Sequence, residues 1–408
     1  MDERSLYERV LGLSAPWTVE AVELDEARDR VDVHVVYEDD GTWSCPECGG
    51  AGRRHDARRR TWRHLDTCQY RTFVTADVPR VECAEHGVRQ VAVPWSEPGS
   101  RFTALFEALA LGWLREASIS AVARRMRLSW DQVDGILARA VRRGLARRSL
   151  SAPRRLAVDE VSAKRGHRYL TIISDHDTGK VLHVSIGRKK VALSSYYAKL
   201  TPDQRAAIEV VSMDMWEAFI AATRDWVPDA EHKIAFDKFH VAQHLGEAVD
   251  KVRRAENKAL LADGDRTLVG TKWLWLRREV NLPEKVAASF EQVRASALQA
   301  ARAWSHKEIA MGLWWKRPRE MIVSAWERWC RGATRSRLEP IVKVAAMVRS
   351  HLAGIVNAIV HQVTNARAEG INSRIQWVKR MANGYRNTER FRHAIYFHLG
   401  GLDVSPAL

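Results

Sequence analysis

Apolar and polar positions follow two different periods along this chain, and the period changes near residue 100. Before that point, apolar side chains alternate with polar ones, which is typical of half-buried strands. Residues 19–24 and 31–37 predict a strand pair, and residues 45–95 predict further short strands. Residues 94–99, with two prolines and a glycine, then interrupt the pattern. We therefore expect a small β domain over residues 1–99.

The next segment has the 3.6-residue period of helices. Residues 120–126 predict one helix and residues 127–129 a short turn, after which Ser129 is suited to cap a second helix. Asp131 in the first turn of that helix favours the positive end of the helix dipole. Two helices at this spacing predict a helix-turn-helix domain over residues 100–152, and an ordinary pair of bundle helices is the alternative.

The remaining chain combines strand and helix patterns. Residues 153–240 predict three strands that can form a meander, followed by strand–helix units, which indicates a mixed sheet flanked by helices. Residues 241–345 show only helical periodicity and contain seven of the sixteen tryptophans. Residues 346–400 are also helical and are expected to complete the α/β domain, so that the Trp-rich block is a separate all-helical domain.

Composition narrows the possible partners and location. The 408 residues include 65 Lys and Arg against 50 Asp and Glu, which gives a formal net charge of +15. Such a charge favours a polyanionic partner, and nucleic acid is the first candidate. The sequence has no apolar run long enough to span a membrane and no signal-peptide pattern, and five cysteines fit reduced thiols better than disulfides. We therefore expect a cytoplasmic protein.

Two short motifs predict one structural zinc ion. The four expected ligands are Cys45, Cys48, Cys83 and His86. They form one CxxC and one CxxH pair, each followed by glycine, and a closed tetrahedral zinc site needs four such ligands. Three other residues could replace one of them, namely His55, His64 and Cys68.

Three acids that are far apart in the sequence are candidates for a second metal site. Asp159 and Asp214 each end a predicted strand, and acids at neighbouring strand ends gather at one edge of a sheet. Glu369 can join them if its helix packs across that edge. Grouped carboxylates repel one another unless cations intervene, and two Mg²⁺ or Mn²⁺ ions would suit phosphodiester chemistry. Asp237 competes with Asp214 for the second position.

The helix that carries Glu369 has further polar side chains. Asn372 and Ser373 follow at i+3 and i+4 and are expected to support the acid, whereas an apolar stripe anchors the opposite face. Basic residues here and in the helix-turn-helix are expected to contact DNA phosphates: Arg124, Arg125, Arg127, Arg139, Arg142, Arg143, Arg367, Arg374, Lys379 and Arg380.

Several strings together resemble a known family. CPECG with the later CAEHG, LAVDEVSAKRGHRYLTIISDHDTG, SMDMW, DKFHV and NARAEGINSRIQWVKRMANGYRN are similar to the ISL-three group of bacterial insertion-sequence transposases. The resemblance implies a DDE transposase with a ribonuclease H-like catalytic core. It implies that Asp159, Asp214 and Glu369 are the catalytic acids and that Asp237 and His240 match a DxxH element.

The resemblance also implies a reaction and partners. The expected reaction is metal-dependent strand cleavage at transposon ends, followed by attack of the freed 3′-hydroxyl on target DNA. The zinc domain and helix-turn-helix would bind terminal inverted repeats, and concerted cutting of two ends implies a dimer or larger assembly. A DNA-binding regulator derived from such an enzyme and a non-transposing nuclease are the rival hypotheses.

Overall fold

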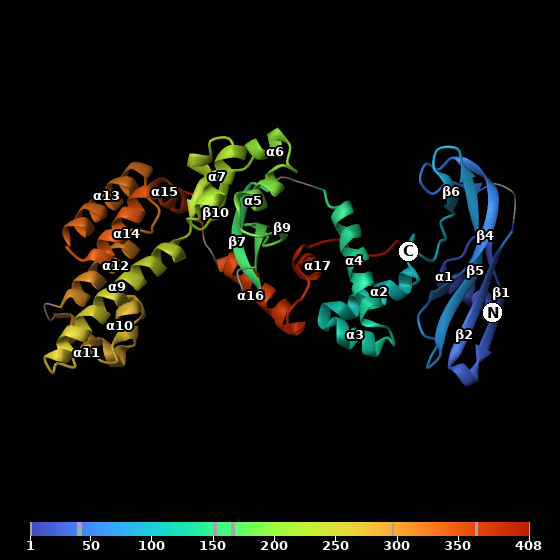
Figure 1. Ribbon diagram of the computed structural model, residues 1–408, viewed down its shortest axis with the longest axis horizontal. Helices are drawn as coiled ribbons and strands as arrows, with labels where there is room; N and C mark the ends of the chain where they lie inside the picture. Colours follow the sequence, from blue (N-terminus) through green and yellow to red (C-terminus); the bar gives the residue numbers. More distant parts are fainter. Residues whose placement is uncertain are drawn as a thin grey trace. The chain divides into compact units, whose positions relative to one another are not determined.

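The chain forms two compact units, which are described separately below (Figure 1). The computed structural model describes residues 2–38, 43–149, 153–164, 168–295, 298–363 and 366–407. One unit comprises Met1–Arg148 with Leu402–Leu408, and the other comprises Ser149–Gly401. The finer division into four domains stays a prediction.

A six-stranded sheet forms the first part of the N-terminal unit. Its elements are α1 (Glu3–Leu11), β1 (Trp17–Asp25), β2 (Arg30–Tyr37), β3 (Trp43–Ser44), β4 (Ala51–Arg63), β5 (Arg71–Cys83) and β6 (Gly87–Gln90). The strand order is β1-β2-β5-β4-β3, with β6 paired to β5. The predicted strand pair is confirmed, because β1 and β2 are antiparallel. Trp95 packs edge to face against Trp17 of β1 and Trp62 of β4 in the core of this unit.

Three helices complete this unit: α2 (Ala104–Glu116), α3 (Ile119–Arg125) and α4 (Trp130–Arg147). Arg127 has a φ of 55° in the turn between α3 and α4. The Ser129 side chain accepts from the backbone N–H of Gln132, and the Gln132 side chain accepts from the N–H of Ser129. This reciprocal capping box fixes where α4 begins. The predicted helix, turn and capped second helix are therefore confirmed.

A mixed five-stranded sheet organises the second unit. Its strands are β7 (Arg155–Lys164), β8 (Arg168–Asp175), β9 (Val181–Ile186), β10 (Val210–Met213) and β11 (Ile234–Phe236), in the order β11-β10-β7-β8-β9. The strands β7, β8 and β9 form an antiparallel meander. The strands β7, β10 and β11 are parallel. The predicted mixed sheet is confirmed.

Helices cover both faces of this sheet (Figure 1). They are α5 (Lys190–Tyr197), α6 (Pro202–Ala206), α7 (Glu217–Trp226), α8 (Ala230–Lys233), α16 (Ala366–Met381) and α17 (Thr388–Leu399). Leu156 and Val158 of β7 share a buried cluster with Leu193 of α5 and Phe219 of α7. Because side chains alternate along a strand, Asp159 points to the opposite face, where α16 contacts β7.

The segment between β11 and α16 contains helices and connecting turns, with no strand among its described residues. It contains α9 (Lys238–Ala262), α10 (Lys272–Leu276), α11 (Glu284–Ala295), α12 (Gln299–Gly312), α13 (Arg319–Arg335), α14 (Glu339–Ser350) and α15 (Leu352–Val360), with one short 3₁₀ turn, η2 (Glu279–Asn281). Trp275, Trp304 and Trp326 are buried in the same apolar cluster as the core of the sheet. These tryptophans therefore stabilise the fold.

No single helix among the described residues has the length and apolar character needed to cross a membrane. The bent pair of α14 and α15 reaches that length and hydropathy only when the two helices are taken together. The apolar side chains of this pair include Val348, Ile355 and Val356, which are fully buried within the unit.

A close helix–strand contact positions the end of β11. A Cβ atom on Gly354 of α15 would lie 2.4 Å from ring atoms of Phe236, the last residue of β11. Only glycine therefore allows α15 to approach this strand so closely. The contact fixes the strand end immediately before Asp237.

We expect Gly354→Ala to destabilise the second unit by about 1–3 kcal/mol, because the added methyl group overpacks the core against Phe236. Gly332→Ala in α13 is the matched control, since nothing lies within 4 Å of its Cβ position and alanine favours helix by up to about 1 kcal/mol. Urea unfolding of both variants measures the difference. Equal stabilities of the two variants would contradict the packing argument.

Candidate metal centres and DNA-binding elements

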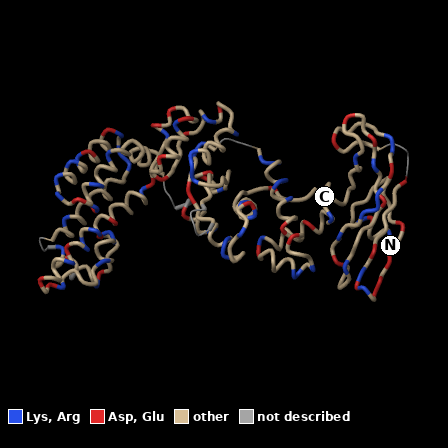
Figure 2. Tube along the Cα trace, in the orientation of Figure 1, with Lys and Arg blue, Asp and Glu red and all other residues tan. Residues whose placement is uncertain are grey.

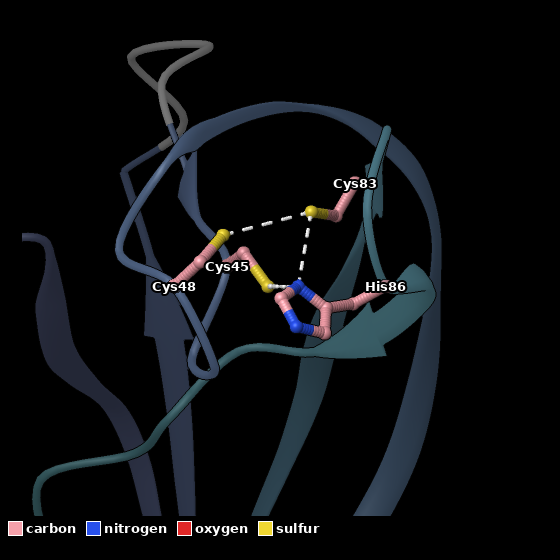
Figure 3. Close-up of side chains that lie close together, drawn as sticks. All are labelled: Cys45, Cys48, Cys83 and His86. Atoms are coloured by element: carbon pink, nitrogen blue, oxygen red, sulfur yellow. Dashed lines mark hydrogen bonds between the residues drawn. The ribbon is translucent and has the colours of Figure 1, made fainter.

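The four predicted zinc ligands meet at one point of the N-terminal unit (Figure 3). The Sγ atoms of Cys48 and Cys83 are 3.7 Å apart, and His86 Nδ1 lies 3.6 Å from Cys83 Sγ and 3.9 Å from Cys45 Sγ. All four ligand atoms lie within 4.8 Å of one another. Distances of this size are those between ligands of one tetrahedral zinc ion.

Local turns create this arrangement. The N–H of Gly49 donates to the carbonyl of Cys45, and Gly49 has a φ of 72°. Gly87 has a φ of 65° and begins β6, opposite Cys83 of β5. Hydrogen bonds from the backbone and ring of His86 and from the backbone of Glu85 lower the pKa of the Cys83 thiol to about 6, which favours the thiolate that zinc binds.

The three alternative zinc ligands, His55, His64 and Cys68, are not part of the group of four ligand atoms. His64 Nδ1 is 2.9 Å from the Thr103 hydroxyl, and burial lowers the pKa of His64 to about 4. His55 Nδ1 lies 3.6 Å from Asp56, and Cys68 is an exposed free cysteine. The Cys₃His set is therefore the group that fits structural zinc.

The strand register aligns three acids of the second unit. Ala157 of β7 is paired with Ser212 of β10, and Ser212 is paired with Ala235 of β11. Asp159, Asp214 and Asp237 each follow their member of this row by two residues. Asp214 and Asp237 directly follow β10 and β11, as predicted, whereas Asp159 lies within β7, which continues to Lys164, so the predicted end of a strand at Asp159 is wrong. The three acids still occupy equivalent positions of adjacent parallel strands, where strand spacing is about 5 Å.

Hydrogen bonds orient these carboxylates. Asp159 Oδ1 accepts from the N–H of Glu160 at 2.7 Å, and Asp159 Oδ2 accepts from Asn372 Nδ2 at 2.6 Å. Asp214 Oδ1 accepts from the N–H of Met215 and lies 3.5 Å from His240 Nδ1. Asp237 caps α9 by accepting from the N–H of Phe239.

The acids influence one another electrostatically. Burial raises the pKa of Asp159, the charge of Asp214 adds to this effect, and the bonds from Glu160 and Asn372 oppose it. Burial also raises the pKa of Asp237, and the charges of Glu369 and Asp159 raise it further. The carboxylates thus form one coupled cluster, in which a nearby cation would relieve the repulsion.

Two oxygen atoms in this cluster are buried and have no hydrogen-bond partner among the described residues: Oδ2 of Asp237 and Oδ1 of Asn372. Carboxylate and amide oxygens are the donors that magnesium prefers. Within the described residues, however, only the zinc ligands form a group of three or more Cys, His, Asp or Glu whose ligand atoms all lie within 4.8 Å. The acid cluster is therefore wider than a cage for one ion.

Helix α16 brings Asn372 and Glu369 to the sheet. Ile371, Ile375 and Val378 are buried along its apolar stripe, as predicted. Ser373 and Glu369 are exposed to solvent, and the charge of Glu369 nevertheless acts on Asp237.

Several predicted DNA contacts have structural partners instead. Arg139 binds Glu107 with both Nε and Nη2, and Glu107 is almost fully buried. Arg143 pairs with Glu97 and Glu107 and donates to the carbonyl of Val404, and its side chain is only 8% exposed. This geometry argues against the DNA-contact role expected for Arg139 and Arg143, because both stabilise α4 within its own unit.

The other predicted basic residues differ in exposure. Lys379 Nζ donates to the carbonyl of Ser162 at 2.9 Å, which ties α16 to β7. Six of the predicted arginines are exposed: Arg124, Arg125, Arg127 and Arg142 in the N-terminal unit, and Arg374 and Arg380 in α16. The side chain of Arg367 lies outside the described residues. Basic residues are spread over both units rather than confined to one (Figure 2).

Other groups beside the acids were not expected from sequence. Arg188 lies 3.8 Å from Glu160, the residue after Asp159, and its guanidinium covers the rings of Tyr169 and Trp216. Trp216 follows Asp214 by two residues, and this closeness to a candidate acid in the sequence could have identified Trp216. Arg188 comes from another loop, and only the fold reveals its position.

Comparison with known proteins gives a consistent family. Residues 156–395 match the model of the ISL3 DDE family, described as a transposase. Residues 91–141 match the helix-turn-helix domain of transposase family ISL3, and residues 41–86 match the zinc-finger of the IS204/IS1001/IS1096/IS1165 transposases. The chain belongs to the ISL3 transposase family.

Two curated relatives extend over most of this transposase. It is 29% identical to the transposase for insertion sequence element IS1557 of Mycobacterium tuberculosis, over 94% of this chain and 93% of the relative. It is 27% identical to the transposase for IS1001 of Bordetella parapertussis, over 85% and 86%. The Drosophila P element transposase strand transfer complex aligns with 75% of this chain and 93% of its own at 8% identity, but a TM-score of 0.39 does not establish a shared fold.

The expectations of a transposase, a zinc ribbon and a helix-turn-helix are confirmed by these matches. A helix-turn-helix in a transposase family implies DNA binding, as the charge of +15 indicated.

We expect Cys48→Ser to release zinc and to lower the unfolding midpoint of the β domain by about 10 °C or more, because structural zinc contributes several kcal/mol to folding. Cys68→Ser is the matched control, since Cys68 is exposed and lies outside the ligand set. Metal content by mass spectrometry and thermal unfolding measure both effects. Full zinc occupancy in Cys48→Ser would contradict the assignment of this ligand.

Proposed function

We propose that this ISL3 transposase cuts DNA at the ends of an insertion sequence and joins the freed 3′-hydroxyl to target DNA. The proposal rests mainly on the equivalent positions of Asp159 within β7, Asp214 after β10 and Asp237 after β11, with the Glu369 charge of α16 acting on Asp237. We further propose that this sheet is a ribonuclease H-like core and that the helices between β11 and α16 are an insertion into it.

Magnesium or manganese would be held by Asp159, Asp214 and Glu369. The buried oxygens of Asp237 and Asn372, which have no partner in the described part of the chain, and the raised pKa of Asp159 support a cation here. Two bound cations would activate the attacking oxygen and stabilise the leaving oxygen of a phosphodiester. The spacing of the acids, which do not all lie within 4.8 Å of one another, supports two ions rather than one.

The chain's own residues prepare this site. The Asn372 amide holds Asp159 in one orientation, which limits the reorganisation needed when a cation binds. His240 lies beside Asp214, where it can donate to the carboxylate or, when protonated, balance its charge. Asp237 shares the row with Asp214, so it is the alternative second ligand, and its bond to Phe239 N–H also gives it a capping role.

DNA recognition belongs to other parts of the chain in this proposal. The zinc ribbon and the helix-turn-helix would bind the terminal inverted repeats, with phosphate contacts from the exposed arginines of α3 and its turn. Concerted cleavage at two ends would require at least a dimer on DNA.

Asp159→Asn tests the catalytic role directly. We expect it to abolish Mg²⁺-dependent cleavage of duplexes that carry the element's own flanking repeats, by at least about 10³-fold, because a ligand carboxylate is lost. End binding should be unchanged. Asp203→Asn, at an exposed acid of α6, is the matched control. Nick mapping and gel-shift assays separate the two effects.

The outcomes separate the rival hypotheses. Full cleavage by Asp159→Asn would contradict the proposed ligand set. Binding without cleavage in the parent protein would favour a regulator. Cleavage without joining of a precleaved end to plasmid DNA would favour a nuclease.

Asp159→Asn is expected to abolish cleavage but to increase the stability of the folded protein. Burial raises the folded-state pKa of Asp159, so the folded state binds this proton more tightly than the unfolded state. The Asp159 carboxylate therefore costs stability as pH rises above the unfolded value of about 4 and through the higher folded value.

Without added Mg²⁺ or Mn²⁺ at pH 7.5, Asp159→Asn should melt at a higher temperature than the parent protein, and the difference should shrink as the pH approaches 4. Mg²⁺ should raise the melting temperature of the parent more than that of the variant. A parent protein that melts higher than the variant without added Mg²⁺ would contradict a destabilising buried charge.

A further inference from the structure

Three side chains form a stack at the edge of the acid cluster. The guanidinium carbon of Arg188 lies 4.6 Å from the ring centre of Tyr169 and 5.0 Å from that of Trp216. The Trp216 indole N–H donates to the Arg188 carbonyl at 3.0 Å. We call Tyr169, Arg188 and Trp216 the aromatic–arginine stack.

The stack is joined to the acids by short links. Trp216 lies two residues after Asp214, immediately before α7. Arg188 Nη1 lies 3.8 Å from Glu160 Oε2, and the N–H of Glu160 donates to Asp159. Arg188 follows the end of β9 and Trp216 follows the end of β10, so the stack lies next to the proposed catalytic carboxylates.

The exposure of Trp216 is not that of a core residue. Its side chain is 40% exposed, whereas Trp275 and Trp326 of the same unit are fully buried. Its single polar group is already satisfied by the Arg188 carbonyl, so the ring is held in place while part of its surface faces solvent. The Arg188 side chain is itself 41% exposed.

We propose that this stack binds an unpaired nucleobase next to the scissile phosphodiester. The proposal rests on the proposed function and adds a ligand for Trp216. The base would stack on the exposed part of the indole, and Arg188 would contact the adjoining phosphate. Every base presents a flat π surface, so this contact needs no particular sequence.

An unpaired base is favoured over a paired one for a physical reason. Bases inside a duplex are covered on both faces by their neighbours, and only a base that has left the helix can stack on a protein ring. Opening a base pair costs a few kcal/mol, and stacking on an aromatic side chain offsets part of that cost. The Glu160 carboxylate beside Arg188 would disfavour a second phosphate there, which limits the stack to one nucleotide.

A fluorescent base analogue reports the contact. The probe is a duplex with the element's own terminal repeat and a single 2-aminopurine, placed in turn at each nucleotide next to the cleavage site. Binding is measured in Ca²⁺ with Asp159→Asn protein, so that cleavage plays no part. A base that leaves the helix without a stacking partner becomes bright, whereas a base stacked on indole stays quenched.

We expect one position to remain quenched with Trp216 present and to become bright with Trp216→Ala. Affinity for that end should fall by roughly 5- to 150-fold, the range expected for one base–aromatic stack. Trp216→Phe should retain most of the quenching. Trp315→Ala is the matched control, because Trp315 is 53% exposed and also carries an arginine, with Arg317 at 3.1 Å from its ring centre.

An abasic substrate distinguishes stacking from a structural role. If Trp216 acts through the base, removal of that base should weaken binding to the parent and leave no further loss for Trp216→Ala. A full additional loss on the abasic end, or equal fluorescence with and without Trp216 at every position, would overturn the proposal. Since these measurements need no cleavage, they remain decisive even if the parent protein proves inactive.

Discussion

The parallel pairing of β7, β10 and β11 is the constraint on which the second unit depends. This register places Asp159, Asp214 and Asp237 at equivalent positions of three adjacent strands. A shift of one residue in either strand pair would turn one of these side chains to the other face of the sheet. The buried residues of the strands resist such a shift, since Val210, Val211 and Ala235 are fully buried. The apolar core therefore fixes the positions of the charges.

Packing and electrostatics oppose each other at this edge. Burial raises the pKa of both Asp159 and Asp237, and neighbouring acids add repulsion. The surrounding structure holds these groups together, with α15 pressed onto β11 at Gly354 and α16 anchored on β7. The cations of the proposed site would recover part of this electrostatic cost.

The two units use polar residues in different ways. In the N-terminal unit, Arg139 forms an ion pair with Glu107, and Arg143 forms one with Glu97. Arg143 also donates to the carbonyl of Val404 in the C-terminal segment. In the second unit, Arg188 lies between two rings at the surface and has one acidic neighbour at 3.8 Å. Arginine thus stabilises α4 in the N-terminal unit, whereas Arg188 in the second unit is partly exposed and can contact a ligand.

The sequence alone determined those features that depend on neighbouring residues. The zinc pairs, the capped start of α4 and the succession of strands and helices in the mixed-sheet domain depend on local spacing, turn residues and periodicity, all of which can be recognised in the sequence. Tertiary structure decided which distant charges meet. Spacing along the chain could not distinguish Asp237 from Asp214, because both end buried strands and both lie in one row. It could not separate the buried Arg143 from the exposed Arg142 beside it, since the partner of Arg143 is supplied by segments far away in the sequence. Helix and strand patterns record local burial, whereas the distance between two remote side chains depends on how the whole core packs.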